Sequence, residues 1–247
     1  MLIDVHAHMD FPQFDSDRAE VIERARKNDI IIINSVVEPA NIEKSLNLNY
    51  ENVFLTIGLS PAKVDRGTLD ATLDLIRQYR DRIVGIGEIG LDYYWIKDTE
   101  KRLFQKEAFM KFIEISKEMR LPLIIHSRDA ESDIIDILGE NKTNAILHCF
   151  SGSVELAKKA ISLGCLISIP TSVVYSKQKQ ELIKSIPINS IVLESDAPFL
   201  APVPKTRNEP SNIVESVKKI SELRDIHEKR IIKITTNNAI KFFNVKI

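Results

Sequence analysis

Short apolar runs alternate with longer amphipathic segments along nearly the whole chain, and this alternation constrains the fold more than any other feature. The apolar runs predict strands over residues 2–8, 30–37, 53–59, 82–90, 121–126, 145–148, 165–169 and 190–194. Helical patterns lie between them and after them, over residues 15–28, 40–49, 68–79, 99–119, 129–138, 154–163, 177–185, 210–223 and 228–243. Strands that alternate regularly with helices, without a break in composition, favour an α/β fold: a single (β/α)8 TIM barrel over residues 1–247.

Composition narrows the class of protein further. No predicted strand is followed by a glycine-rich phosphate fingerprint, which disfavours a dinucleotide-binding fold. The net charge of −1 is not that of a generally basic protein, so any contact with nucleic acid must come from local patches. Cys149 and Cys165 are too few for a disulfide framework. With no secretory signal and no apolar run long enough to span a membrane, a cytoplasmic protein is expected.

The first predicted strand carries a His-x-His pair. Apolar and polar residues alternate from Ile3 onward, so Asp4, His6 and His8 are predicted to share one face of the strand. Ile3, Val5 and Ala7 are predicted to lie on the other face. Two imidazoles that close together on a stiff strand form a ready pair of metal ligands, although such a pair alone is a weak signal.

Other candidate ligands also lie at the ends of apolar runs. His126 and His148 each end a predicted strand, Glu88 lies within one, and Asp196 closely follows the last. A nearly buried carboxylate such as Glu88 needs a cation, either a metal or an arginine. The carboxyl ends of barrel strands converge on one mouth, where active sites lie. The sequence therefore predicts a metal site made of six residues: His6, His8, Glu88, His126, His148 and Asp196.

Four imidazoles and two carboxylates exceed what one tetrahedral ion uses. They suit two divalent ions roughly 3.5–4 Å apart, bridged by one carboxylate. Glu88 is the predicted bridge, and Asp196 is free to hold one ion and to accept a proton from the attacking water. Imidazoles favour Zn or Mn and carboxylates tolerate Mg, so the identity of the metal stays open.

These motifs together resemble the TatD family of metal-dependent hydrolases, one of the amidohydrolase-like barrels. The matching segments are His6-x-His8, Gly87-Glu-Ile-Gly-Leu-Asp-Tyr-Tyr94, His126-Ser-Arg-Asp129, His148-Cys-Phe-Ser-Gly152, Glu194-Ser-Asp-Ala-Pro198 and Asn208-Glu-Pro210. The resemblance implies a divalent-metal deoxyribonuclease, which in some members acts from the 3′ end of single-stranded DNA. It also implies that His6, His8, Glu88 and Asp196 hold one ion and that Glu88, His126 and His148 hold the other. The family usually has His-Pro where this chain has Ser60-Pro61, so a contact from that loop is not carried over.

Further residues are expected around the cage. Asp4, Asp92 and Glu194 are expected to support the ligands from behind. The candidate phosphate-binding residues are Arg128, Lys205 and Arg207, for which plain surface charge is the alternative. The candidate base-stacking residues are Tyr93, Tyr94 and Trp95, for which core packing is the alternative. Cys149 is expected on the opposite face of its strand from the neighbouring ligand, as an inert thiol.

Three functions compete at this point. The first is a deoxyribonuclease that acts on single-stranded DNA ends, with no membrane and no obligate protein partner. The second is an amidohydrolase or esterase on the same pair of metals, including a deacylase of aminoacyl-tRNA. The third is a non-catalytic metal-binding protein, which the set of intact candidate ligands disfavours.

Overall fold

The strands form a closed barrel in which each strand pairs in parallel with its neighbours in chain order. The computed structural model describes residues 1–143 and 145–245. The strands are β1 (Leu2–Ala7), β2 (Ile30–Val36), β3 (Val53–Ile57), β4 (Gly85–Gly90), β5 (Leu123–His126), β6 (Ala145–Leu147), β7 (Leu166–Pro170) and β8 (Ile191–Glu194). The barrel closes where Asp4 of β1 pairs with Leu193 of β8. The prediction of a (β/α)8 barrel is confirmed.

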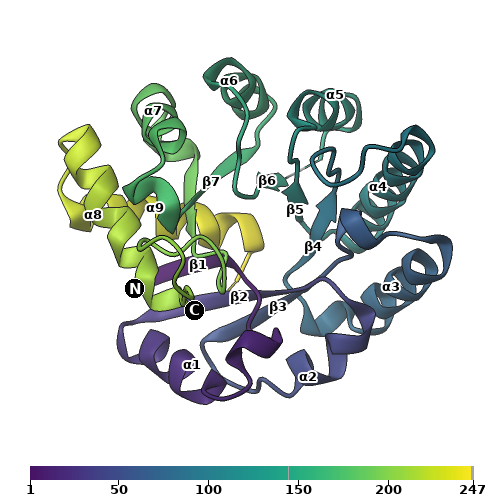
Figure 1. Ribbon diagram of the computed structural model, residues 1–247, viewed down its shortest axis with the longest axis horizontal. Helices are drawn as coiled ribbons and strands as arrows, with labels where there is room; N and C mark the ends of the chain where they lie inside the picture. Colours follow the sequence, from purple (N-terminus) through teal and green to yellow (C-terminus); the bar gives the residue numbers. More distant parts are fainter. Residues whose placement is uncertain (144, 246–247) are drawn as a thin grey trace.

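Helices cover the outside of the barrel, and Figure 1 shows α1 to α8 in sequence order around the strands. The helices are α1 (Arg18–Lys27), α2 (Ile42–Leu46), α3 (Arg66–Gln78), α4 (Thr99–Met119), α5 (Glu131–Asn141), α6 (Val154–Ser162), α7 (Lys177–Ser185), α8 (Ile213–Arg224) and α9 (Glu228–Phe243). Short 3-10 turns lie at Pro12–Phe14, Pro39–Asn41, Pro61–Lys63, Arg80–Arg82, Thr171–Val174, Ile188–Ser190 and Pro210–Asn212. None of the described helices is both long enough and apolar enough to cross a membrane.

Apolar side chains fill both faces of the strands, as β2 illustrates. Ile31 and Ile33 pack inside the barrel, whereas Ile30 and Ile32 pack outward against the helices. The run of β-branched residues in this strand is the pattern expected of a strand that is buried on both sides.

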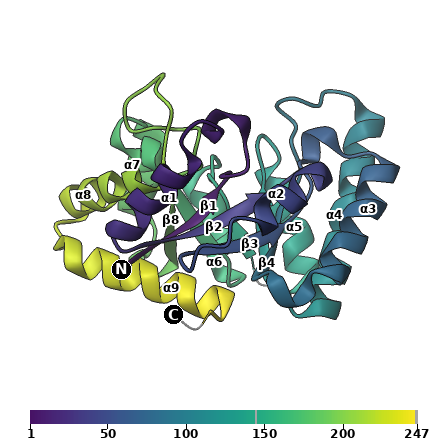
Figure 2. The ribbon, with the colours of Figure 1, turned by 90° about the horizontal axis from the view of Figure 1, so that it is seen from below.

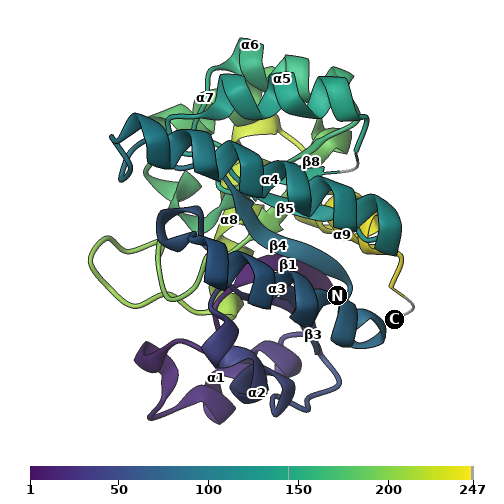
Figure 3. The ribbon, with the colours of Figure 1, turned by 90° about the vertical axis from the view of Figure 1, so that its right-hand side faces the viewer.

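Helix α9 closes the amino end of the barrel and leaves the other end open. It lies on the same side as the N-terminus in Figure 2, beneath the strands, and Phe243 packs into the interior cluster. The Thr236 hydroxyl donates a hydrogen bond to the Met1 carbonyl at 3.1 Å, and the Asn238 amide donates to the Ile191 carbonyl at 2.8 Å. Figure 3 shows the loop after β8 protruding on the side away from the C-terminus, where the carboxyl ends of the strands open.

The first strand departs from the predicted alternation. The register of β1 against β2 shifts between Asp4 and Ala7, where one extra residue is inserted. A bulge of this kind resets which face each side chain takes. Ile3 and Val5 pack in the barrel interior, whereas Ala7 packs in the outer layer. The prediction that these three residues share one face was therefore wrong, because strict alternation does not continue through a bulge.

Candidate metal centre and substrate pocket

The carboxyl ends of five strands bring the predicted ligands together. Each of the six side chains lies in a strand or within two residues of its end, and each is largely buried. Their sources are His6 and His8 at β1, Glu88 in β4, His126 at the end of β5, His148 after β6 and Asp196 after β8.

Glu88 lies at the centre, with its two carboxylate oxygens facing different histidines. Oε1 lies 2.7 Å from Nδ1 of His126 and 3.9 Å from Nε2 of His148. Oε2 lies 3.4 Å from Nε2 of His6 and 3.6 Å from Nε2 of His8. A single carboxylate therefore connects two groups of imidazoles.

The close packing around Glu88 depends on glycine. A Cβ atom on Gly58 would lie 2.3 Å from the Glu88 carbonyl oxygen, and one on Gly87 would lie 2.7 Å from Cβ of Ile124. Real side chains do not approach this closely. The glycines of β4 and of the turn after β3 thus let Glu88 sit between its neighbours.

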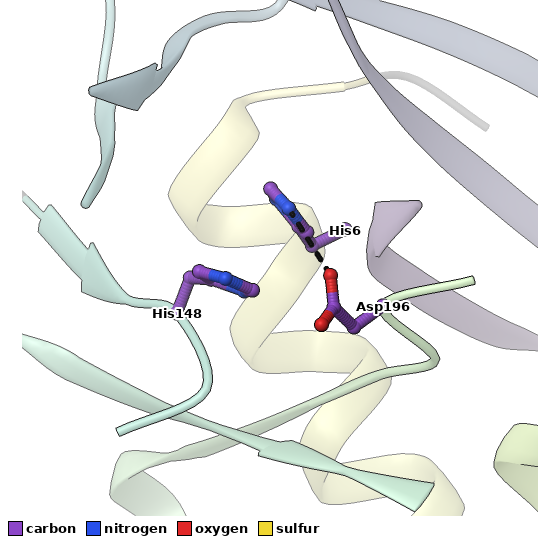
Figure 4. Close-up of side chains that lie close together, drawn as sticks. All are labelled: His6, His148 and Asp196. Atoms are coloured by element: carbon purple, nitrogen blue, oxygen red, sulfur yellow. Dashed lines mark ion pairs between the residues drawn. The ribbon is translucent and has the colours of Figure 1, made fainter. Parts of the chain in front are cut away.

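His6, His8 and Asp196 form the other half of the centre. The Nε2 atoms of His6 and His8 lie only 3.2 Å apart, so at most one of them carries a proton toward the other. Oδ1 of Asp196 lies 3.8 Å from His6 Nε2 and 3.7 Å from His8 Nε2. Figure 4 shows His6, His148 and Asp196 converging from separate strands.

Three sets of residues each bring their ligand atoms within 4.8 Å of one another. The sets are His6–His148–Asp196, His6–His8–Glu88 and Glu88–His126–His148. Imidazole nitrogens and carboxylate oxygens that converge in this way are the donors that divalent first-row ions prefer. The facing nitrogens of His6 and His8 fit a shared cation better than they fit each other. The donor set thus fits divalent metal ions, and two of the three sets contain Glu88, the predicted bridge.

Groups behind the ligands fix the orientation of their rings. Oδ2 of Asp92 lies 2.8 Å from Nε2 of His126, and Oε2 of Glu194 lies 3.1 Å from Nδ1 of His148. The backbone carbonyl of Ser35 lies 3.0 Å from Nδ1 of His8. Contacts of this kind select the tautomer that leaves the other ring nitrogen free to bind a metal.

Asp4 supports the centre differently from the prediction. Its carboxylate accepts hydrogen bonds from the Ser195 amide at 2.8 Å, the Ser195 hydroxyl at 2.5 Å and the His6 amide at 3.3 Å. It does not bond to the His6 ring, whose Nδ1 has no partner among the described residues. The physical reason is again the bulge, which turns Asp4 toward β8. Asp4 therefore holds the backbone that carries Asp196.

Asn208 clamps the loop after β8 to the barrel. Its fully buried amide donates to the Ser195 carbonyl at 2.7 Å and to Oγ1 of Thr171 at 2.9 Å. Its side-chain oxygen accepts from the Glu209 amide at 2.9 Å. These bonds fix the return of the loop beside Asp196.

The two central carboxyl groups have pKa values shifted in opposite directions. Burial acts to raise the pKa of Glu88, but hydrogen bonds from His126 and His6 outweigh it and hold this pKa well below its usual value. Burial raises the pKa of Asp196 well above its usual value, with His6 opposing the shift and the Glu194 carboxylate adding to it. Glu88 is thus an anion at the centre, and Asp196 is a proton-accepting group once a cation draws off its own proton.

The histidines differ in the same way. Burial and the neighbouring His6 lower the pKa of His8 to about 3, which keeps the ring neutral and able to bind a metal. Burial acts to lower the pKa of His126, but its hydrogen bonds with Asp92 and Glu88 prevail and raise it to about 10. A metal at His126 must therefore compete with a proton.

A pocket of about 880 Å³ opens above the candidate centre. Trp95 and Arg128 line it beside the ligands, and the Trp95 side chain is 65% exposed. The Arg128 guanidinium lies 3.7 Å from the centroid of the Tyr94 ring and 5.8 Å from that of Trp95. Arg128, Tyr94 and Trp95 thus form one cationic and aromatic surface, with Trp95 and Arg128 facing the pocket.

Four residues predicted to bind substrate do not line this pocket: Tyr93, Tyr94, Lys205 and Arg207. The Tyr93 hydroxyl donates to Asp133 at 2.7 Å and its ring packs under Arg102, so it serves packing. Arg207 is held in a bidentate ion pair with Asp17. Lys205 and Arg207 both line a separate, neighbouring pocket. Tyr93, Tyr94, Lys205 and Arg207 thus lie outside the lining of the metal pocket, because the paths of the loops decide which side chains face it; their contact with substrate stays a prediction.

The pocket wall also contains residues that sequence reasoning missed. Lys179 of α7 is only 6% exposed, and its ammonium donates to the carbonyls of Cys149 and Phe150 without forming an ion pair with a described residue. Tyr175 and Phe199 line the pocket from the loops after β7 and β8. No motif marks these positions; only the fold brings them to the mouth.

Cys149 lies on the pocket wall and not on the opposite face as expected. Its backbone turns to a φ of 44° directly after the strand, which ends the alternation. Burial raises the pKa of its thiol to about 12, so the expectation of an unreactive thiol agrees with its surroundings.

Comparisons with known proteins agree with this geometry. The family model described as TatD related DNase matches residues 3–244. An uncharacterized metal-dependent hydrolase of Methanocaldococcus jannaschii is 35% identical, over 99% of this chain and 98% of the relative. The human protein named deoxyribonuclease TATDN3 is 34% identical, over 98% of this chain and 94% of the relative.

A solved structure shares the whole architecture. The crystal structure of YJJV, a TatD homologue from Escherichia coli K12, superposes with a TM-score of 0.90 at 27% identity. The match covers 99% of this chain and 98% of that one. The chain is a member of the TatD-related DNase family of metal-dependent hydrolases.

Proposed function

We propose that this protein hydrolyses phosphodiester bonds of DNA, using two divalent ions held by His6, His8, Glu88, His126, His148 and Asp196. The observation that carries the proposal is the central position of Glu88, whose two oxygens face two different groups of histidines. The resemblance to the human deoxyribonuclease supports DNA as the substrate.

The ions would lower the pKa of the attacking water and offset charge that grows on the phosphate oxygens. Glu88 supplies the negative charge that holds both ions together. Asp196 accepts the proton of the attacking water, because its carboxylate lies beside the ligands and burial raises its pKa well above the usual value. Asp92 and Glu194 hold the rings of His126 and His148 in the orientation that binding requires.

Cations and an exposed aromatic ring around the pocket favour a nucleic-acid substrate. Arg128 and Lys179 both line the pocket, and neither forms an ion pair with a described residue. The buried Lys179 ammonium gains most from a phosphate, because a buried charge is costly until it meets its opposite. Trp95 presents an exposed ring, and a base stacks on such a ring only where it has left the duplex. We therefore propose single-stranded DNA ends as the preferred substrate.

The decisive experiment is an activity panel on protein stripped of metal and reconstituted separately with Mg, Mn or Zn. The panel contains single-stranded DNA, duplex DNA, RNA, aminoacyl-tRNA and small carboxylic esters. We expect metal-dependent release of nucleotides, fastest from single-stranded DNA. Asp196→Asn serves as the inactive control, and Glu140→Gln, a change at an exposed position of α5, serves as the neutral one. Hydrolysis of esters or aminoacyl-tRNA without any cleavage of DNA would replace the nuclease with a carbonyl hydrolase.

A further inference from the structure

A second pocket adjoins the metal pocket. It measures about 530 Å³ and lies under the loop that follows β8, which protrudes at the open end of the barrel in Figure 3. Tyr175, Phe199 and Leu200 line both pockets. Two of the three are aromatic, so an aromatic ridge separates two compartments of one continuous surface.

The rings of this ridge are exposed and close to the candidate centre. Tyr175 is 45% exposed and Phe199 is 44% exposed. The Phe199 ring meets the His8 ring edge to face, with centroids 6.4 Å apart, and the Phe11 ring likewise at 6.1 Å. Exposed apolar side chains that gather beside a cleft, unlike scattered ones, are typical of ligand-binding grooves. Since the Phe199 ring is in contact with the candidate ligand His8, a base stacked on Phe199 would lie close to the metal centre.

The ridge and Trp95 lie on opposite sides of the mouth. Tyr175 follows β7 and Phe199 follows β8, whereas Trp95 follows β4. In a closed barrel of eight strands in chain order, β4 and β8 face each other across the axis. The ligands lie between these two aromatic surfaces.

The second pocket has the charge that a phosphate requires. Lys205 and Arg207 line it, and no acidic side chain does. Arg207 is already paired with Asp17, which makes it part of the wall. Lys205 forms no ion pair within the described part of the chain, so its ammonium is available to a ligand.

We propose that the second pocket binds the next nucleotide of the DNA strand, with its base on the Tyr175–Phe199 ridge and its phosphate on Lys205. The inference rests on the proposed function and extends it. The strand crosses the mouth, with one nucleotide at Trp95 and the other over the ridge, and the scissile phosphate lies between them. Cleavage therefore improves with substrate length until this pocket is filled.

The test compares kcat/KM for the methyl phosphodiester of a single nucleotide, which leaves the ridge empty, with kcat/KM for single-stranded dinucleotides, tetranucleotides and decanucleotides with the same terminal sequence. Wild type gains in kcat/KM as the chain lengthens. Tyr175→Leu and Phe199→Leu each remove a ring but keep apolar bulk, and each lowers this gain about 5- to 150-fold, the equivalent of one lost stacked base at ~1–3 kcal/mol. A change of equal size for every substrate, the methyl phosphodiester of a single nucleotide included, would assign the rings a structural role and overturn the proposal.

Lys205→Gln gives an independent readout that does not alter packing, since the residue is exposed. The slope of log affinity against log salt concentration for a decanucleotide becomes shallower by about 0.7, the contribution of one single-strand phosphate. Lys229→Gln, an exposed change on α9 at the closed end of the barrel, leaves the slope as in wild type. A Lys205→Gln slope equal to that of the control would overturn the phosphate contact.

The outcomes separate this inference from the function beneath it. Wild type that cleaves no DNA of any length with any metal removes the proposed function itself. Wild type that cleaves DNA while the ridge variants keep the full gain with length leaves the nuclease intact and removes the second subsite. Wild type without any gain with length removes it as well.

Discussion

Replacing Glu194 with glutamine should selectively weaken the binding of one of the two metal ions, although Glu194 itself is not expected to bind metal. The side chain is fully buried and has two separate partners. Oε1 accepts a hydrogen bond from the Cys149 amide at 2.8 Å, and Oε2 lies 3.1 Å from Nδ1 of His148. A carboxylate accepts from both donors at once, which directs the His148 proton to Nδ1 and leaves Nε2 free.

A glutamine cannot meet both demands. If its oxygen accepts from the Cys149 amide, its NH2 group faces His148 Nδ1, which must then accept and move the ring proton to Nε2. If the side-chain amide is rotated by 180°, its NH2 group points at the Cys149 N–H, and two hydrogen-bond donors face each other. Loss of such a supporting contact typically costs 10- to 100-fold in metal affinity, or about 1.4–2.7 kcal/mol. This loss of affinity should affect the ion that Glu88, His126 and His148 are proposed to hold.

Competition titration with a chelator of known affinity measures this effect, with total metal counted by mass spectrometry. We expect wild type to bind two ions and Glu194→Gln to bind one with nearly unchanged affinity and the other 10- to 100-fold more weakly. Glu140→Gln, at an exposed position of α5, should match wild type. Two ions of unchanged affinity in Glu194→Gln would refute the tautomer argument, and equal weakening of both would show that the effect spreads through the barrel.

Other changes test the rest of the centre. Glu88→Gln should lower the content of both ions, measured as metal per chain after dialysis, because a neutral amide cannot offset two shared dications; two retained ions would exclude a bridge. Asp196→Asn at saturating Mn should lower kcat on a labelled oligonucleotide about 10²- to 10⁴-fold while the Kd for DNA stays similar, and wild-type turnover would exclude a proton-accepting role. Trp95→Ala should raise KM for single-stranded DNA about 5- to 150-fold, and an unchanged KM would leave that ring without a base. Gly58→Ala should lower the free energy of unfolding by about 1–3 kcal/mol in denaturant titration, because the added methyl group would overlap the Glu88 carbonyl oxygen. An unchanged free energy of unfolding would show that β4 moves to accommodate the methyl group without cost.

The order and type of the elements could be predicted from the sequence because each depends on local patterning. The β-branched run of β2 indicates a strand buried on both faces, and Ile30 to Ile33 do alternate between the interior and the outer layer. Boundaries were less well predicted: residues 15–17 and 210–212 were expected in helices, but α1 begins at Arg18 and α8 at Ile213.

The ligand residues could also be named from the sequence, since a parallel barrel brings every strand's carboxyl end to one mouth. His126 and His148 are marked by the apolar runs that they end, and Glu88 by the cost of burying a lone carboxylate. Their roles as ligands remain predictions, but their convergence follows from topology alone. This is why residues more than a hundred positions apart could be grouped correctly.

Only the tertiary structure decided which side chains face the pocket and which groups support the ligands. A single extra residue in β1 turns Asp4 away from the His6 ring and toward Ser195, and no local pattern announces a bulge. Loop residues such as Lys205 and Tyr175 reach the mouth by paths that depend on packing between loops. The local sequence carries periodicity and burial, whereas long-range contacts fix the course of the loops, because the energy that holds them comes from partners distant in the chain.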